Sequence, residues 1–371
     1  MSSPAPPLAL IAELTHRCPL ACPYCSNPLE LASASTELDT ATWLRLIDEA
    51  AALGVLHLHL TGGEPMARRD LNDIIAHAHA RGLYINLITA GVTLDAGRLA
   101  LLREAGLDHI QLSFQDAEAE GGDHIGGLRG GHARKLAAAR LIADSDIALT
   151  LNFVVHRANL ERLEQMIALA EQLGAQRMEI AHTQYHGWAM RNRAALLPTA
   201  AQLDAANATV TQARARLAAR LRIDYVVPDY FAEYPKACMG GWARNTLLVD
   251  PTGRAMPCHA AHGIPGMDWP RLRETSLGAA WRSAPFERFR GTGWMPEPCR
   301  SCERREIDWG GCRCQALALT GHAERTDPVC VKSPDHAMVA ALAAAAGNDA
   351  SATVPVAWQY RSAKPDPTTA R

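Results

Sequence analysis

Short apolar runs alternate with longer amphipathic segments through the first half of the chain. The amphipathic segments place apolar residues three or four positions apart, as helices do, whereas the short runs have the length and composition of strands. A series of such units predicts a parallel sheet covered by crossover helices, an α/β fold. The six predicted strands span residues 8–14, 55–60, 83–89, 108–114, 147–155 and 177–181.

Polar residues and glycines mark the ends of the predicted helices. Asp39 or Thr40 is placed to cap the first helix. Gly54, Gly82 and Gly174 follow helix ends, where a left-handed residue is favoured. The sheet can be open or curl into a partial or full barrel, and in each case functional loops follow the C-terminal ends of the strands.

Length, charge and composition narrow the class of protein. A chain of 371 residues forms one large domain or two smaller ones. A net charge of −2 provides no broad basic surface for nucleic acid or an acidic membrane. The chain has no run of about 20 apolar residues, and its N-terminal sequence is a poor signal peptide, because no Lys or Arg precedes an apolar run that Glu13 interrupts. We therefore expect a cytoplasmic protein, in which clustered cysteines indicate metal binding or catalysis.

Three of the ten cysteines follow the first predicted strand. Cys18, Cys22 and Cys25 are separated by three residues and then by two. An odd number of thiols does not pair into disulfides, and a closed structural zinc site uses four ligands. Three thiolates on one short loop therefore favour a centre that keeps an open coordination position.

The loop after the second predicted strand reads TGGEP, residues 61–65. Gly62 and Gly63 would let a ligand approach the backbone closely, and the Glu64 carboxylate can accept a hydrogen bond from an ammonium group. Glycine and proline also form plain strand-to-helix turns, but the neighbouring three-cysteine loop favours a ligand site here.

The two loops together resemble the radical SAM superfamily. The resemblance implies a partial (β/α)6 barrel of the TIM type and a [4Fe–4S] cluster on the three cysteines, with one iron free to bind S-adenosylmethionine. It also implies cofactor contacts from a tyrosine of the cysteine loop and from the TGGEP loop. These candidate residues are Tyr24, Thr61, Gly62, Gly63 and Glu64.

Two further loops lie at the same edge of the predicted sheet. Ser113 ends the fourth strand and Gln115 follows it, so both are candidate cofactor contacts, with ordinary loop roles as the alternative. A third turn, usually Thr-Asn-Gly in the superfamily, reads Thr89-Ala90-Gly91 here, and no cofactor contact is inferred for Ala90.

Seven further cysteines lie beyond residue 237, and most are closely spaced. The segment 299–314 resembles the SPASM extension, which holds two auxiliary iron–sulfur clusters. Its pattern has a third cysteine where this chain has Asp308. A carboxylate oxygen can ligate iron, so seven thiolates and Asp308 supply eight ligands for two sites. The alternatives are two zinc ribbons and, for Asp308, an ordinary solvent-exposed acid.

The family plan interleaves early and late cysteines between the two auxiliary sites. It assigns the first site to Cys238, Cys258, Cys312 and Cys314. It assigns the second site to Cys299, Cys302, Asp308 and Cys330. Because Cys314 is additional to the usual pattern, the first cluster is either [4Fe–4S] or [2Fe–2S], and the second is expected to be [4Fe–4S].

From about residue 8 to 335 the chain resembles the branch of the superfamily that begins pyrroloquinoline quinone (PQQ) biosynthesis. This implies a carbon–carbon bond between Glu and Tyr side chains of a PqqA-like precursor peptide, presented by a PqqD-like chaperone. A one-electron reductant such as flavodoxin would feed the reaction. Spacing does not identify the proton acceptor. The alternatives are another SPASM peptide-modifying enzyme, sulfatase-maturing or thioether-forming, and a non-catalytic zinc-binding scaffold.

The resemblance divides the chain into four parts. Residues 1–7 form a tail, 8–225 the radical SAM core, 226–335 the SPASM domain, and 336–371 a C-terminal helix with a loose tail. Three residues after the sixth strand are candidates for lining the peptide cleft. They are Gln184, Tyr185 and Trp188.

Overall fold

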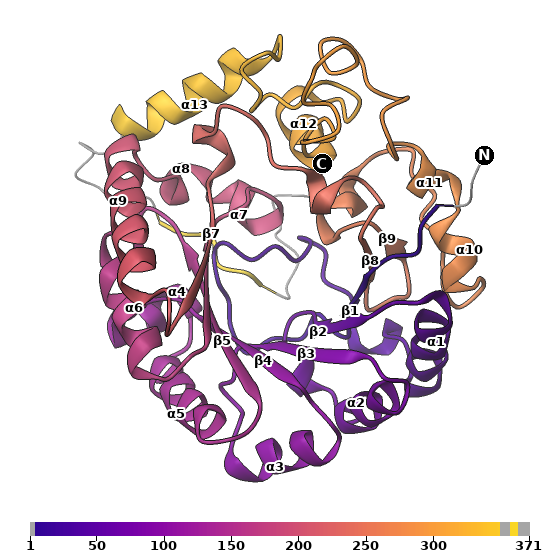
Figure 1. Ribbon diagram of the computed structural model, residues 1–371, viewed down its shortest axis with the longest axis vertical. Coiled ribbons are helices and arrows are strands. Elements are labelled where there is room, and N and C mark those ends of the chain that lie inside the picture. The colour runs from indigo at the N-terminus through magenta and orange to yellow at the C-terminus, as the bar shows by residue number, and fades with distance from the viewer. Residues whose placement is uncertain (1–3, 349–356, 363–371) are drawn as a thin grey trace.

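A computed structural model describes residues 4–348 and 357–362, and its strands form one curved sheet with helices along the outer side (Figure 1). The sheet has nine strands in the order β7-β6-β5-β4-β3-β2-β1-β8-β9. Every pair from β7 to β8 is parallel, and β8 pairs with β9 antiparallel. This confirms the predicted α/β class with a parallel sheet.

All six predicted strands are present. They are β1 (Ala9–Glu13), β2 (His57–Thr61), β3 (Tyr84–Thr89), β4 (His109–Phe114), β5 (Ala148–Val155) and β6 (Arg177–His182). Three further strands extend the sheet beyond the sequence prediction, namely β7 (Arg222–Val226), β8 (Thr246–Val249) and β9 (Ala255–Met256). Because β8 pairs with β1, part of the cysteine-rich region belongs to the same sheet as the N-terminal strands.

Crossover helices cover the outer face of the sheet. They are α1 (Thr40–Leu53), α2 (Leu71–Ala80), α3 (Ala96–Glu104), α4 (Ala119–Gly126), α5 (Gly131–Ala143), α6 (Leu163–Gln172) and α9 (Ala200–Leu217). The predicted cap of the first helix is confirmed, because the Asp39 side chain accepts a hydrogen bond from the Thr42 N–H at 2.8 Å. Gly54 ends this helix in the left-handed conformation, with φ of 89°.

Further helices lie on the open side of the sheet and in the C-terminal region. They are α7 (Gly187–Arg191), α8 (Arg193–Leu196), α10 (Leu277–Trp281), α11 (Ala284–Glu287), α12 (Arg313–Thr320) and α13 (His336–Asn348). The last of these confirms the predicted C-terminal helix. Within the described part of the chain, no helix is long and apolar enough to cross a membrane.

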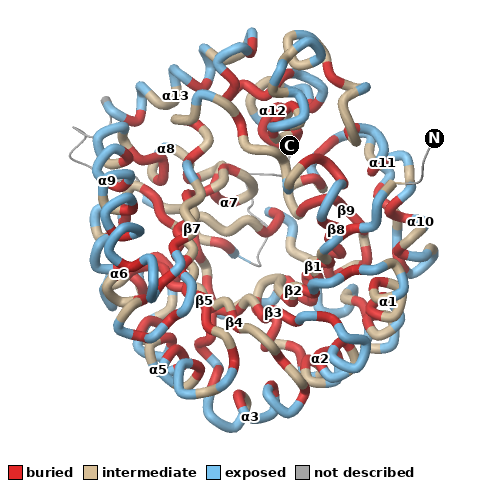
Figure 2. Tube along the Cα trace, viewed as in Figure 1, coloured by how far each residue is buried: buried red, intermediate tan, exposed pale blue. Residues whose placement is uncertain are grey.

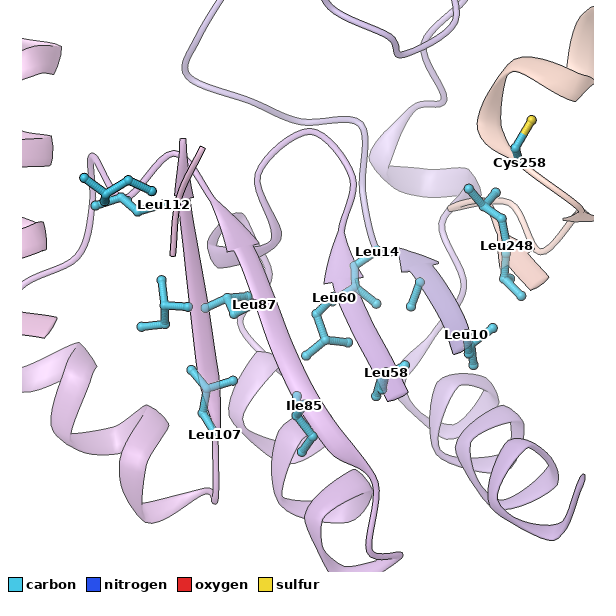
Figure 3. Packing of buried hydrophobic residues seen from close by; sticks show 14 of the residues in the cluster. Leu10, Leu14, Leu58, Leu60, Ile85, Leu87, Leu107, Leu112, Leu248 and Cys258 are labelled. Atoms are coloured by element: carbon cyan, nitrogen blue, oxygen red, sulfur yellow. The ribbon is translucent and has the colours of Figure 1, made fainter. Parts of the chain in front are cut away.

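The main core lies between the sheet and its outer helices (Figure 3). Leu58, Leu60, Ile85 and Leu87 are fully buried there, and each such side chain contributes about 1.5–3 kcal/mol through burial. Figure 2 shows the same division, with buried residues along the strands and exposed residues on the outer helix faces.

The opposite face of the sheet is polar. Asn86 Nδ2 lies 3.3 Å from His59 Nδ1, and Gln111 Nε2 donates to Glu179 Oε2 at 3.1 Å. Because successive residues of a strand point to opposite faces, the same strands supply an apolar core on one side and a polar interior on the other.

The predicted loose tail is wrong for residues 357–362. This segment is described and packs near the centre of the arc of strands, where Arg361 is only 8% exposed. The rest of the predicted tail, residues 349–356 and 363–371, lies outside the described residues.

Candidate active site

The loop that follows β1 brings Cys18, Cys22 and Cys25 to the C-terminal edge of the parallel sheet. A turn closes the second half of the loop, where the Cys25 N–H donates to the Cys22 carbonyl at 3.2 Å. Cys22 packs against Leu20 and Ala90 in a small apolar cluster. The loop therefore presents three thiols from one short, well-packed turn.

Burial makes these thiols hard to ionise without a positive partner. It raises the pKa of Cys18 to about 11 and of Cys25 to about 12, and it raises the pKa of Cys22 as well. The charges of Lys135 and Arg361 oppose this effect. Thiolates are the ligands of iron–sulfur clusters, and bound metal supplies the missing positive charge. The residues of this loop therefore fit a cluster.

The TGGEP loop after β2 is hydrogen-bonded to the residues that lead into the cysteine loop. Gly63 N donates to Thr15 O at 2.6 Å, and Glu64 N donates to Arg17 O at 2.7 Å. A Cβ atom on Gly63 would lie 2.4 Å from Arg17 O. Glycine is therefore required by the close approach of two loops of this chain, a reason that the sequence analysis did not foresee.

Glu64 joins the TGGEP loop to the turn after β3. Its carboxylate is 1% exposed and accepts hydrogen bonds from Thr89 Oγ1 at 2.7 Å, Met66 N at 3.0 Å and Ala90 N at 2.8 Å. A carboxylate has about four acceptor positions, and these hydrogen bonds use three of them. Glu64 therefore positions the turn at Ala90, and its contact with the cofactor ammonium stays a prediction. Thr61, the last residue of β2, pairs in register with Glu13 at the same edge.

Lys135 of α5 connects the two cofactor candidates at the end of β4. Its ammonium donates to Ser113 O at 2.6 Å and to Gln115 Oε1 at 2.5 Å, and the side chain is only 2% exposed. Burial lowers the pKa of Lys135 to about 8. The sequence analysis missed this residue. A lysine on the buried face of an alanine-rich helix is unusual, and this signal could have identified it.

Tyr24 of the cysteine loop also lies in this part of the site, beside Gln115. Burial raises the pKa of its hydroxyl, which hydrogen-bonds with Gln115 and lies beside Cys22. Its ring lies 5.6 Å from the ring of His156. The structure thus brings Tyr24, Gln115 and the cysteine loop together, as the sequence analysis expected.

The thiols assigned to the first auxiliary site are buried together. Cys238 and Cys314 each interact with both Cys258 and Cys312, which perturbs the pKa of all four thiols. His186 hydrogen-bonds with Cys312 from the loop after β6. Four thiols from three separate segments therefore meet at one point, in the grouping predicted from the sequence.

The ligands assigned to the second auxiliary site line one small cavity. They are Cys299, Cys302, Asp308 and Cys330. Asp308 is 7% exposed, so the alternative of a solvent-exposed acid is wrong. Its Oδ1 accepts a hydrogen bond from Gly310 N at 3.1 Å, and its Oδ2 lies 3.4 Å from Arg304 Nε.

No group of three or more Cys, His, Asp or Glu side chains among residues 4–348 and 357–362 has an arrangement suited to one metal ion. An iron–sulfur cluster interposes several iron and sulfide atoms between its ligands, so the ligands stand farther apart than those of one ion. The three groups of ligands described above suit clusters by their chemistry, because thiolates dominate each of them.

Asp327 lies between the two auxiliary sites, and the sequence analysis missed it. Its Oδ2 accepts a hydrogen bond from Cys312 N at 2.7 Å, and its Oδ1 accepts one from Gln315 Nε2 at 2.9 Å. The same residue lines the cavity of the second site. Burial raises the pKa of Asp327 to about 6. This carboxylate therefore couples the positions of the two ligand groups.

A larger cleft extends from Pro28, three residues after Cys25, to the first auxiliary site. Pro28 and Glu30 line one end, Tyr185 and His186 line the middle, and Cys314 belongs to its wall. Tyr185 therefore lines a cleft after the sixth strand, and its contact with a peptide stays a prediction.

Two neighbouring predictions for the cleft are wrong. Trp188 is not among the lining residues and is only 5% exposed. The Gln184 amide, in the orientation that satisfies its neighbours, donates to Asp229 Oδ2 at 2.7 Å and accepts from Lys236 Nζ at 3.1 Å. Both side chains stabilise the loop that carries Tyr185.

Comparison with known proteins finds matches for both the N-terminal sheet region and the cysteine-rich C-terminal region. Residues 12–170 match the radical SAM superfamily, and residues 238–303 match the iron–sulfur cluster-binding domain SPASM. The chain is 59% identical to a PqqA peptide cyclase of Methylocella silvestris over 359 residues, 96% of each chain. It is 56% identical to a PqqA peptide cyclase of Granulibacter bethesdensis over 349 residues, 94% of this chain and 93% of that one.

A solved structure shares the fold at low sequence identity. Streptococcus suis SuiB bound to S-adenosylmethionine matches with a TM-score of 0.72 and 19% identity, over 88% of this chain and 78% of that one. The shared architecture therefore includes both the sheet and much of the C-terminal region.

Proposed function

The chain belongs to the radical SAM superfamily and, within it, to the family of PqqA peptide cyclases, and from this we propose that it joins a Glu and a Tyr side chain of a PqqA-like peptide. Its family makes it a radical SAM peptide-modifying enzyme of PQQ biosynthesis, with a SPASM domain. The observation that carries the proposal is a cleft that begins at Pro28, just after the cysteine loop, and reaches Cys314 of the first auxiliary site.

Cys18, Cys22 and Cys25 would hold a [4Fe–4S] cluster with one open iron. S-adenosylmethionine bound there supplies a 5′-deoxyadenosyl radical after one-electron reduction. Lys135 offers a buried positive charge beside this site, and Tyr24 and Gln115 shape its wall. Glu64 keeps the turn at Ala90 in position through the hydrogen bond described above.

The proposed reaction removes two hydrogen atoms from the peptide. The Glu γ-carbon would give up a hydrogen atom to the radical that the bound cofactor supplies, with 5′-deoxyadenosine as the coproduct. The same carbon would then bond to the Tyr ring, ortho to the hydroxyl. The ring would regain aromaticity by losing a proton to a base and one electron, for which the auxiliary ligand groups would hold an acceptor.

The two auxiliary ligand groups support this route for the electron. Cys238, Cys258, Cys312 and Cys314 would hold the cluster nearer the cleft, because Cys314 lines it. Cys299, Cys302, Asp308 and Cys330 would hold the second, and Asp327 contacts both groups. Family membership supports iron–sulfur clusters over the zinc-ribbon alternative.

Two partners complete the proposal. A PqqD-like chaperone would present the peptide, and a one-electron reductant such as flavodoxin would reduce the cluster of the cysteine loop. The reaction is placed in the cytoplasm, where thiols and a low-potential reductant are maintained.

Anaerobic protein with reconstituted clusters, a PqqA-like peptide, S-adenosylmethionine and a reductant tests the function. Mass spectrometry should show the peptide lighter by two hydrogen atoms, with fragment ions that join the Glu and Tyr residues. Peptides with Glu→Ala or Tyr→Phe substitutions separate the two reacting positions. A product that instead carries a thioether or a formylglycine would favour the other SPASM activities.

The variant with Cys18, Cys22 and Cys25 replaced by Ala is the matched control. It should form no 5′-deoxyadenosine and no cross-link, yet retain the iron of the auxiliary sites, because those ligands lie elsewhere in the chain. Formation of 5′-deoxyadenosine at the parental rate in this variant would refute the assignment of the radical site.

A further inference from the structure

The C-terminal segment 357–362 contacts both sides of the cysteine loop, although more than 300 residues of sequence separate them. The backbone N–H of Arg361 donates to Ala21 O at 3.0 Å, within the loop between Cys18 and Cys22. The guanidinium of Arg361 donates to His16 O, ahead of the loop. Arg361 thus forms hydrogen bonds both just before the cysteine loop and at its middle.

Neighbouring contacts fix the register of this segment. The Trp358 and His124 rings are stacked with centroids 4.8 Å apart, and the Tyr360 hydroxyl donates to His124 O at 3.0 Å. The Asn192 side chain accepts from Gln359 N at 2.7 Å and donates to Gln359 O at 2.8 Å. Paired hydrogen bonds of this kind hold the backbone at one register, so the arginine that follows reaches a defined position.

Arg361 is buried without a carboxylate partner among the described residues. It is 8% exposed, and its Nε has no hydrogen-bond acceptor. A buried guanidinium is costly unless a negative group compensates it. The backbone N–H of Arg361 donates within the cysteine loop and its guanidinium donates just ahead of that loop. The negative charge that complements Arg361 is therefore that of the thiolate site.

We propose that Arg361 is a positioning residue of the radical site, supplied by a C-terminal clamp formed by residues 357–362. It keeps the cysteine loop closed around the cluster, and its charge raises the reduction potential of that cluster. A nearby positive charge favours the more negative, reduced state, and net charge, hydrogen bonding and solvent exposure set such potentials. This inference rests on the proposed binding of a cluster by the three cysteines.

Full-length protein with reconstituted clusters tests the clamp, using Arg361→Gln, Arg361→Lys and the control Arg134→Gln. Arg134 has the same charge and lies exposed on α5. Redox titration followed by electron paramagnetic resonance (EPR) should show a lower midpoint potential for the radical cluster in Arg361→Gln, and a smaller shift in Arg361→Lys. A chelator should also remove iron from this cluster about tenfold faster in Arg361→Gln, as expected for the loss of one charge-assisted hydrogen bond.

The auxiliary clusters provide an internal reference, because their EPR signals and potentials should match those of the parent in all variants. Equal potentials and equal iron loss in Arg361→Gln and Arg134→Gln would overturn the proposal. If the parent shows no EPR signal that S-adenosylmethionine perturbs, the assignment of the cluster itself fails, which is a different result.

Hydrogen exchange on the parent protein tests the docked segment without any substitution. The amides of Gln359 and Arg361 should be protected, because both donate hydrogen bonds to residues distant in the sequence. Exchange of both amides at the rate of an unfolded chain would also overturn the clamp.

Discussion

The Glu64 carboxylate accepts a hydrogen bond from the backbone N–H of Ala90, with Oε2 and N 2.8 Å apart. The bond joins the TGGEP loop after β2 to the turn after β3, and the Thr89 hydroxyl strengthens the link at 2.7 Å. Because the donor is a backbone N–H, the turn keeps this contact with alanine at the position where the superfamily usually has asparagine.

Glu64→Gln should weaken this connection between loops. The substitution removes the charge and places an amide donor where the carboxylate now accepts hydrogen bonds from three donors. We expect the free energy of unfolding to fall by about 1–3 kcal/mol and the affinity for S-adenosylmethionine to fall with it. Urea unfolding and cofactor titration measure the two effects, and Glu104→Gln on the exposed face of α3 is the control. A loss of affinity without a loss of stability would favour direct contact with the cofactor.

Gly63→Ala should displace the cysteine loop. The new Cβ would lie 2.4 Å from Arg17 O and 2.6 Å from His16 O, and backbone atoms cannot rotate away as a flexible side chain can. We expect the loss of most of the iron bound at the cysteine loop and of cofactor cleavage. Gly293→Ala is the matched control, because Gly293 is exposed and a Cβ there meets nothing within 4 Å. Equal iron content in the two variants would contradict the prediction.

Asp308→Ala should alter the second auxiliary cluster alone. Removal of the carboxylate opens one ligand position in the cavity shared with Cys299, Cys302 and Cys330. We expect a changed EPR signal and impaired cross-linking, while cofactor cleavage in the absence of peptide largely survives. Asp308→Cys should restore ligation at a different potential, because a carboxylate oxygen is a harder ligand than sulfur.

Glu306→Ala provides the control for this site. Glu306 is an exposed acid two residues away that pairs with Arg305. An Asp308→Ala enzyme that behaves like Glu306→Ala in both EPR and cross-linking would show that the carboxylate does not ligate the cluster.

His156 should make the fold sensitive to acid. Burial lowers its pKa to about 3, below the value of about 6.5 in an unfolded chain. The native state therefore binds fewer protons than the unfolded state, so the stability is fully present above about pH 6.5 and falls as the pH drops toward the folded pKa. At about pH 5 this effect amounts to at most about 2 kcal/mol.

His156→Gln should flatten this part of the stability profile. We expect a smaller difference between the urea midpoints at about pH 7 and about pH 5 than in the parent. His322→Gln, at an exposed position, should leave the difference unchanged. The prediction fails if both variants and the parent lose the same stability over this interval.

Local signals accounted for the strands and for the first helix cap, whereas the resemblance to the SPASM extension supplied the grouping of the later cysteines. Alternation with period two in β4 and the Asp39 cap depend on neighbours within a few residues, so the sequence contains them. The strand β8 escaped prediction, because its pairing with β1 joins residues more than 200 positions apart. The contacts of Glu64 with Ala90 and Thr89 were not predicted either, because these partners come from the next loop.

The spacing of Cys18, Cys22 and Cys25 determined by itself that three thiols would share one turn, because a loop of eight residues leaves them no other place. Only the tertiary structure decided which charges surround them. Lys135 comes from the helix α5 that follows β4, three strands along the sheet from β1, and Arg361 comes from the far end of the chain. Such contacts form only when the chain folds and buries these charged groups. A buried charge is stable only beside an opposite charge, and the local sequence does not show where that charge lies.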